Sequence, residues 1–252
     1  MTRMKFSRGC FLSFCAASVA AFWFAATPLL AAEETGLATP GQSAKALKLH
    51  YLKVGKPDAA ALLAPPPVPG SAEQTADLDE VRAVFHAAGS NDVAAAYSEK
   101  SFTVFNFAPA VGPFFVSNNL PQTAAFFARV QSDAAAVTDQ GKDFFRRPRP
   151  YTTDPALANG KLEKSFSYPS GHSTESMVLA LVLADLLPEK RDAIIAHART
   201  IGWHRVQIAR HYATDIYAGR VLALAIVKQF QKSDAFQKDF AAVKEELAAA
   251  QK

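Results

Sequence analysis

Three short polar stretches, separated by apolar runs with helical spacing, restrict how this chain folds. They are Lys142-x6-Arg149-Pro150, Pro169-Ser170-Gly171-His172 and Arg205-x5-His211-x3-Asp215. The runs around them repeat apolar residues at intervals of three and four, which is the spacing of one helix face. Patterns that alternate apolar and polar residues, as strands do, are missing from the sequence. The sequence therefore predicts an all-α protein, a compact helical bundle that brings the three stretches into one site.

Proline and small polar residues divide the chain into expected helices. Residues 100–120 are rich in Phe, Pro and Asn and are expected to be irregular or to form short helices around core-packed aromatic rings. A polar loop is expected over 151–168. The longer helices are predicted from about residue 71, over 122–147 as one helix or two, and over 170–188, 189–211, 213–231 and 234–251.

The N-terminal residues have the pattern of a secretory signal peptide over 1–32. Basic residues Arg3, Lys5 and Arg8 precede an apolar run, and the small residues Ala31 and Ala32 end it. An uncleaved N-terminal anchor is the alternative. We expect residues 33–70 to form a surface arm with a stiff, proline-rich lead-in, and 71–252 to be one helical domain.

Removal of this segment changes the bulk properties of the chain. The formal net charge of +4 falls to about +1, so no general basic face argues for a nucleic-acid polymer as partner. Both cysteines, Cys10 and Cys15, lie within the segment, so we expect a mature protein without a disulfide. No later stretch is long and apolar enough to predict stable membrane insertion.

The Pro169–His172 stretch is typical of an anion-binding helix start. Ser170 is a favourable N-cap, and Gly171 allows a ligand to approach the backbone closely. The free N–H groups and the dipole of a helix N-terminus favour negative charge there. We therefore expect the Ser170 hydroxyl and the amides of Gly171 and His172 to hold phosphate oxygens, although an ordinary capped helix has the same pattern.

The third stretch places a carboxylate beside a histidine. His211 and Asp215 are four residues apart, hence expected on one helix face, where Asp215 orients the imidazole as a nucleophile or base. Arg205 lies nearly two turns earlier and reaches the same pocket. Lys142 and Arg149 are seven residues apart and are likewise expected on one helix face.

Other charged residues are given simpler interpretations. Arg146 and Arg147 are expected to be solvated, and His204 receives no role. Three adjacent cations repel a metal ion, so we expect no metal site and no cofactor.

Together the three stretches resemble the tripartite signature of the type 2 phosphatidic acid phosphatase and vanadium haloperoxidase superfamily. The proline-rich Leu62–Pro67 segment and the tail from Asp234 resemble the bacterial class A non-specific acid phosphatases within it. One departure is His204, which stands where the signature usually has serine. The likeness covers roughly residues 60–250.

This resemblance implies a metal-independent helical phosphatase that hydrolyses phosphomonoesters with broad specificity through a phosphohistidine. It implies that His211 is the nucleophile, that Asp215 orients it, and that His172 is the general acid and later the base. The residues implied to hold the phosphoryl oxygens are Lys142, Arg149, Ser170, Gly171 and Arg205. The expected protein is periplasmic or secreted, acts on a small phosphomonoester, and forms a homo-oligomer as its relatives suggest.

Three alternatives remain open at this stage. A lipid or isoprenoid (pyro)phosphate phosphatase shares all three stretches, and a vanadate-dependent haloperoxidase uses the same pocket. A phosphate-binding protein without turnover is the third, although plain binding does not need His172 together with the His211–Asp215 pair. For the phosphatase we expect an acidic activity optimum, because His172 must be protonated while His211 is neutral.

Overall fold

The structure is a computed structural model that describes residues 49–251. The predicted signal peptide, residues 1–32, and the first part of the predicted arm lie outside this range. Within 49–251 the chain forms helices and no strands, which confirms the all-α prediction. The helices are α1 (Ala59–Leu62), α2 (Ala72–Ala87), α3 (Ser90–Ser98), η1 (Val104–Phe107), α4 (Ala108–Val111), η2 (Ser117–Asn119), α5 (Pro121–Phe145), α6 (Pro150–Thr153), η3 (Pro155–Leu157), α7 (Gly171–Leu186), η4 (Pro188–Lys190), α8 (Arg191–Gln207), α9 (Ala213–Phe230) and α10 (Asp234–Ala250).

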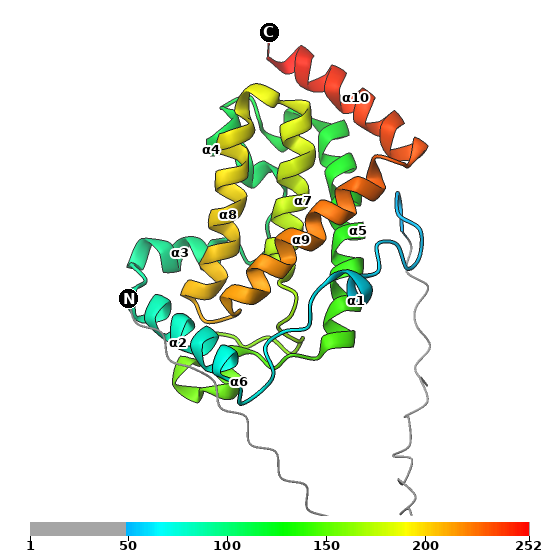
Figure 1. Ribbon diagram of the computed structural model, residues 1–252. Coiled ribbons are helices and arrows are strands. Elements are labelled where there is room, and N and C mark those ends of the chain that lie inside the picture. The colour runs from blue at the N-terminus through cyan, green and yellow to red at the C-terminus, as the bar shows by residue number, and fades with distance from the viewer. Residues whose placement is uncertain (1–48, 252) are drawn as a thin grey trace, which may run out of the picture. The chain divides into compact units, whose positions relative to one another are not determined.

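Helix α7 is the centre of the bundle and packs against α5, α8 and α9 (Figure 1). It is apolar on most sides, as a helix surrounded by others must be. Val178, Leu179 and Leu183 on α7 are fully buried, together with Ile226 on α9. This packing places the end of α5, the start of α7, the end of α8 and the start of α9 at the lower end of the view in Figure 1.

Part of the predicted surface arm packs against the bundle. Tyr51 and Leu52 are buried, and the backbone N–H groups of residues 50–52 donate to the carboxylate of Asp133 on α5 at 2.8–3.0 Å. A buried carboxylate is satisfied when several N–H groups donate hydrogen bonds to it. Residues 49–52 therefore belong to the packed structure, and the predicted boundary at residue 70 stays a prediction.

Two helix ends differ from the predictions. The 122–147 segment is the single helix α5, which stops at Phe145 because Arg146 adopts a left-handed conformation with φ of 50°. Helix α8 stops at Gln207 and not near 211, and Ala209 has φ of 51°. A residue in the left-handed conformation ends a helix. The sequence gives little sign of this conformation at Arg146 and Ala209, because neither residue is glycine.

Candidate active site

The three polar stretches meet at one end of the bundle, as predicted. Lys142 lies in the last turn of α5, Ser170 caps α7, and Arg205 lies in the last turn of α8. The N-termini of α7 and α9 are joined there by a hydrogen bond of 3.1 Å from the Ser170 N–H to the Asp215 carbonyl. Two helix N-termini therefore point their positive ends at the same place.

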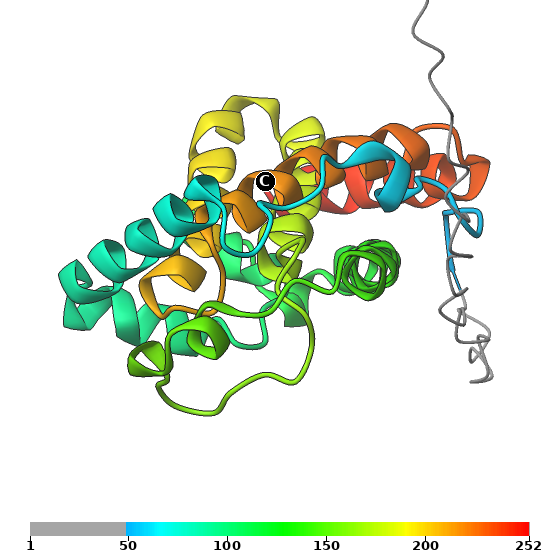
Figure 2. The same ribbon diagram turned by 60° about the horizontal axis from the view of Figure 1, so that its bottom comes forward.

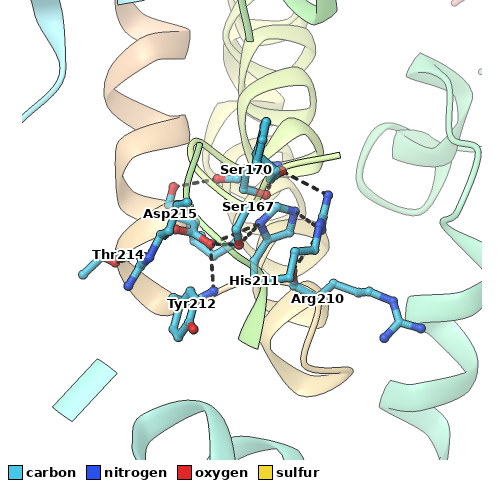
Figure 3. Close-up of polar contacts among 12 residues, drawn as sticks. Ser167, Ser170, Arg210, His211, Tyr212, Thr214 and Asp215 are labelled. Carbon is cyan, nitrogen blue, oxygen red and sulfur yellow. Dashed lines mark hydrogen bonds and ion pairs between the residues drawn. The ribbon is translucent and has the colours of Figure 1, made fainter. Parts of the chain in front are cut away.

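The spacing predicts that His211 and Asp215 share a helix face. This prediction is wrong, because His211 precedes α9. Asp215 is the third residue of α9, and the turn before the helix folds His211 back over it. The His211 Nδ1 lies 3.3 Å from Asp215 Oδ2 (Figure 3). Its Nε2 lies 3.2 Å from Arg149 Nη1. A carboxylate only accepts and a guanidinium only donates. The geometry therefore assigns the proton to Nδ1 and the lone pair to Nε2.

Asp215 is held on every side by donors. Its Oδ2 accepts from the Ser167 hydroxyl at 2.5 Å and from the Tyr212 N–H at 2.9 Å, in addition to His211 (Figure 3). Its Oδ1 accepts from Arg147 Nη1 at 2.6 Å. Burial raises the pKa of Asp215, but the hydrogen bond from His211 and the charge of Arg147 outweigh burial and hold the pKa below its ordinary value. The carboxyl group is therefore ionised and fixed.

The prediction that Arg147 is solvated is wrong. Arg147 is buried between Asp215 and Asp77 of α2, at 2.6 and 2.7 Å, and its guanidinium lies 3.7 Å from the Tyr212 ring centroid. Arg146 ends the helix in a left-handed conformation, and the residue after it, Arg147, turns inward while Arg146 stays exposed. Arg147 thus ties α2 to the carboxylate that orients His211.

Lys142 and Arg149 share the site without sharing a helix, so the prediction of one helix face is wrong. Arg149 lies beyond the end of α5 in extended conformation, between Pro148 and Pro150, which cannot continue a helix. Its guanidinium donates to the carbonyls of Ser165 and Arg210 at 2.9 Å. Burial lowers the pKa of Lys142, and the charge of Arg149 lowers it further. The two cations are therefore close.

Ser170 and Gly171 begin α7 as predicted. The Ser170 hydroxyl accepts from the Ser173 N–H at 3.3 Å, which leaves its own hydrogen available for a ligand. A Cβ placed on Gly171 would lie 3.6 Å from Lys142 Nζ. The Lys142 ammonium group therefore lies beside the N-terminus of α7.

His172 is held by α3. Its Nε2 lies 3.1 Å from the backbone carbonyl of Glu99, which only accepts, so Nε2 carries a proton and Nδ1 is the free atom. Burial lowers the pKa of His172 to about 3, assisted first by Arg205 and then by Lys142 and Arg149. Without a bound anion, His172 is therefore neutral at mildly acidic pH.

Glu99 also positions Arg205 and His204. Its Oε2 accepts from Arg205 Nη2 at 3.3 Å and lies 2.8 Å from His204 Nδ1. His204, the departure from the family signature, thus shares the Glu99 carboxylate with the motif residue Arg205. Glu99 connects the end of α3 to both the second and the third polar stretch.

The ionisable groups of the site shift one another's pKa values. Burial lowers the pKa of Arg149 and of Arg205, and the carboxylate of Glu163 opposes this for both. Glu163 Oε2 contacts Arg149 Nη2 at 2.5 Å. Burial lowers the pKa of His211 well below its ordinary value, and the Arg149 charge adds to this. The site holds a neutral nitrogen base among positive charges, which is a setting for an anionic substrate.

Sequence reasoning missed several residues of the site. Among them, Ser167 lies two residues before the Pro169–His172 stretch, so its position was a usable signal. Glu99 and Glu163 lie in segments without a recognisable pattern.

Among residues 49–251, no group of three or more His, Cys, Asp or Glu side chains is placed to hold a metal ion. No helix in that range is both long and apolar enough to cross a membrane.

Comparison with known proteins gives consistent matches. Residues 124–233 match the PAP2 superfamily model. The chain is 30% identical to the non-specific acid phosphatase of Providencia stuartii over 216 residues, which cover 79% of this chain and 85% of that protein. It is 32% identical to the non-specific acid phosphatase of Salmonella typhi over 56% of this chain and 59% of that protein. A shorter match, 43% over 53 residues, covers 21% of this chain and 23% of the lipid A 1-phosphatase of Rhizobium etli.

Proposed function

Because the chain belongs to the non-specific acid phosphatases of the PAP2 superfamily and is a phosphoric monoester hydrolase, we propose that it hydrolyses small phosphomonoesters through a phosphohistidine on His211. The observation that carries this proposal is the placement of His211 between the Asp215 carboxylate and the Arg149 guanidinium. Asp215 holds Nδ1–H, and the Nε2 lone pair faces the guanidinium of Arg149 among the other cations. A nucleophile oriented by a fixed carboxylate is the arrangement that covalent catalysis uses.

In the first step the Nε2 lone pair attacks phosphorus, and the bond from phosphorus to the ester oxygen breaks. Arg149 turns its N–H groups from Nε2 onto the phosphoryl oxygens as the substrate enters. Lys142, Arg205, the Ser170 hydroxyl and the amide of Gly171 hold the remaining oxygens. Fixed cations and amides of this kind stabilise the charge on the equatorial oxygens of the transition state, and losing one commonly costs ~10²–10³ in rate.

His172 handles the proton in both steps. It protonates the leaving oxygen of the ester, then takes a proton from water as that water attacks the phosphohistidine and releases inorganic phosphate. Burial is the main cause of the low His172 pKa of about 3, and the charges of Arg205, Lys142 and Arg149 add to it. A bound phosphate dianion offsets those cations and raises the pKa, and acidic solution favours the protonated form. This supports an acidic optimum.

The proposal also includes metal independence and export. The three cations supply the positive charge that metal ions supply in many other phosphatases. We propose a periplasmic or secreted location on the basis of the N-terminal residues 1–32, whose pattern is that of a signal peptide.

A lipid-linked phosphate is the second candidate substrate. The favouring observation is the local match to a lipid A 1-phosphatase. The two candidates differ in whether a phosphate ester in a vesicle or micelle is hydrolysed better than a small soluble one.

The test is hydrolysis of p-nitrophenyl phosphate by the purified protein in excess EDTA between pH 4 and pH 8. We expect turnover that survives the chelator, is highest in acid, and is lost in His211→Ala. His86→Gln, which changes an exposed histidine on α2, is the matched control and should retain full activity. Turnover that EDTA abolishes, or that His211→Ala retains, contradicts the mechanism. Faster hydrolysis of a phosphatidic acid vesicle than of any soluble ester favours the second candidate.

A further inference from the structure

A cavity of about 470 Å³ adjoins the phosphoryl site. Arg205 lines it, and so does Glu163, whose carboxylate contacts Arg149. Its walls come from the end of α3, the end of α8 and the long loop between α6 and α7, the yellow-green segment in Figure 2. The cavity therefore lies next to two of the residues proposed to hold the phosphoryl group, Arg205 and Arg149.

The walls of this cavity are strongly cationic. Lys100, Lys161 and Lys164 line it, and within residues 49–251 none of the three has an ion-pair partner. Arg210 also lines it and donates to the carbonyls of Ile208, Asn159 and Lys161. Among residues 49–251 no carboxylate forms an ion pair with it. Glu163 is the one carboxylate among the lining residues, and it is already paired with Arg149.

The size and the remaining walls fit a small carbon skeleton. A volume of this order is typical of a pocket for a small molecule. Tyr97, Leu162 and Ile208 supply apolar surface between the charges. A ligand that fills the cavity would thus place a short carbon chain on these side chains and a negative group among the lysines.

We infer that this cavity, the lysine pocket, binds a second anionic group of the substrate, so that the preferred substrates are small phosphomonoesters that also carry a carboxylate or a second phosphate. The inference rests on the proposed function, because it takes Arg205 and Arg149 as the groups that hold the scissile phosphate. Clustered cations beside a binding site raise the local concentration of an anion and lower its KM. Each solvent-exposed charge pair contributes a small binding free energy. Several such pairs together raise kcat/KM about tenfold.

The test compares two substrates with the same carbon skeleton. Glycerol 3-phosphate carries a hydroxymethyl group where 3-phosphoglycerate carries a carboxylate. We expect a kcat/KM about tenfold higher for 3-phosphoglycerate, mainly through KM. In the triple variant Lys100→Gln, Lys161→Gln and Lys164→Gln, this ratio should fall towards one, because kcat/KM for 3-phosphoglycerate falls much more than kcat/KM for glycerol 3-phosphate.

A charge-matched variant separates the pocket from the general field of the protein. Lys228→Gln on α9, Lys232→Gln in the turn that follows it and Lys238→Gln on α10 remove the same charge, and this variant should keep the preference. A ratio near one in the wild-type protein, or an equal loss in both triple variants, overturns the lysine pocket while His211-dependent turnover leaves the proposed function intact. Failure of His211→Ala to abolish turnover would instead overturn the function on which the pocket depends.

Discussion

Arg147 Nη1 lies 2.6 Å from Asp215 Oδ1, on the oxygen opposite the one that faces His211. The same guanidinium reaches Asp77 through Nη2 at 2.7 Å. One buried cation thus holds two buried carboxylates, and only one of them touches the nucleophile. The orientation of His211 therefore depends on α2, a helix that contributes no residue to the three polar stretches.

Replacing Arg147 by Met should lower both stability and activity. Removing one partner of a buried ion pair leaves the other charge uncompensated, at a cost of about 3–5 kcal/mol. Two carboxylates lose their partner here. Urea unfolding measures the loss, and Arg146→Met is the control, because that neighbouring arginine is exposed and its change should cost less than about 0.5 kcal/mol. Equal stability of the two variants contradicts the account of Arg147.

Ser167→Ala should reduce kcat while the protein stays folded. The Ser167 hydroxyl donates to Asp215 Oδ2 at 2.5 Å and lies 3.5 Å from His211 Nδ1. A hydrogen bond to a charged group contributes about 1.5–3 kcal/mol, so a loss of about tenfold to a hundredfold is expected. Ser176→Ala removes a buried hydroxyl of α7 that bonds the Ala198 carbonyl, and it should leave kcat unchanged. The prediction fails if the two variants have the same kcat for p-nitrophenyl phosphate.

Two glycines near Ser170 should respond differently to alanine. At Gly219 a Cβ would lie 2.9 Å from the Ser170 carbonyl oxygen, so the backbone must shift, and overpacking of this kind costs about 1–3 kcal/mol. At Gly171 the nearest atoms would be 3.5 and 3.6 Å away, which is ordinary contact. We expect Gly219→Ala to lower Tm, and Gly171→Ala to keep Tm but weaken competitive inhibition by phosphate. A wild-type Tm for Gly219→Ala, or unchanged phosphate inhibition in Gly171→Ala, shows the packing argument to be wrong.

Glu175 should set part of the pH dependence. Burial raises its pKa to about 7, and its Oε2 accepts from Gln131 at 2.9 Å. Below pH 7 the group is neutral; above it, a carboxylate beside Lys142 competes with the phosphate. In the wild type kcat/KM should therefore fall as the pH rises through about 7.

Glu175→Gln tests this directly. The variant should retain a higher fraction of its pH 5 activity at pH 8 than the wild type, since the amide never ionises. Glu189→Gln, an exposed change beyond α7, should follow the wild-type profile. Identical alkaline limbs for Glu175→Gln and the wild type contradict the role of Glu175.

Much of this site follows from local sequence. Ser170 and Gly171 begin a helix because a capping hydroxyl and a small residue precede an apolar run. The convergence of His211, Asp215, Arg205 and Lys142 follows from helices that must bury their apolar faces together.

The remainder depends on backbone turns and on contacts distant in sequence. Arg147 turns inward directly after the left-handed Arg146, and non-glycine residues give little sign of that conformation. Glu99 lies more than 100 residues before His204 and Arg205 in the chain, and it positions both through tertiary packing. Such partners have no local periodicity from which to predict them.

The phosphohistidine itself is the central claim, and it is best trapped in His172→Asn. The p-nitrophenolate leaving group is a weak base, so its departure depends less on a proton than that of an alkyl ester. His211 is therefore still phosphorylated in this variant, while loss of the base slows attack by water. We predict that an alkaline quench followed by peptide mass spectrometry finds a phosphoryl group on His211 in this variant and none in the His172→Asn, His211→Ala double variant. Sustained turnover with no phosphorylated His211, or a phosphoryl group that the double variant retains, would contradict the account.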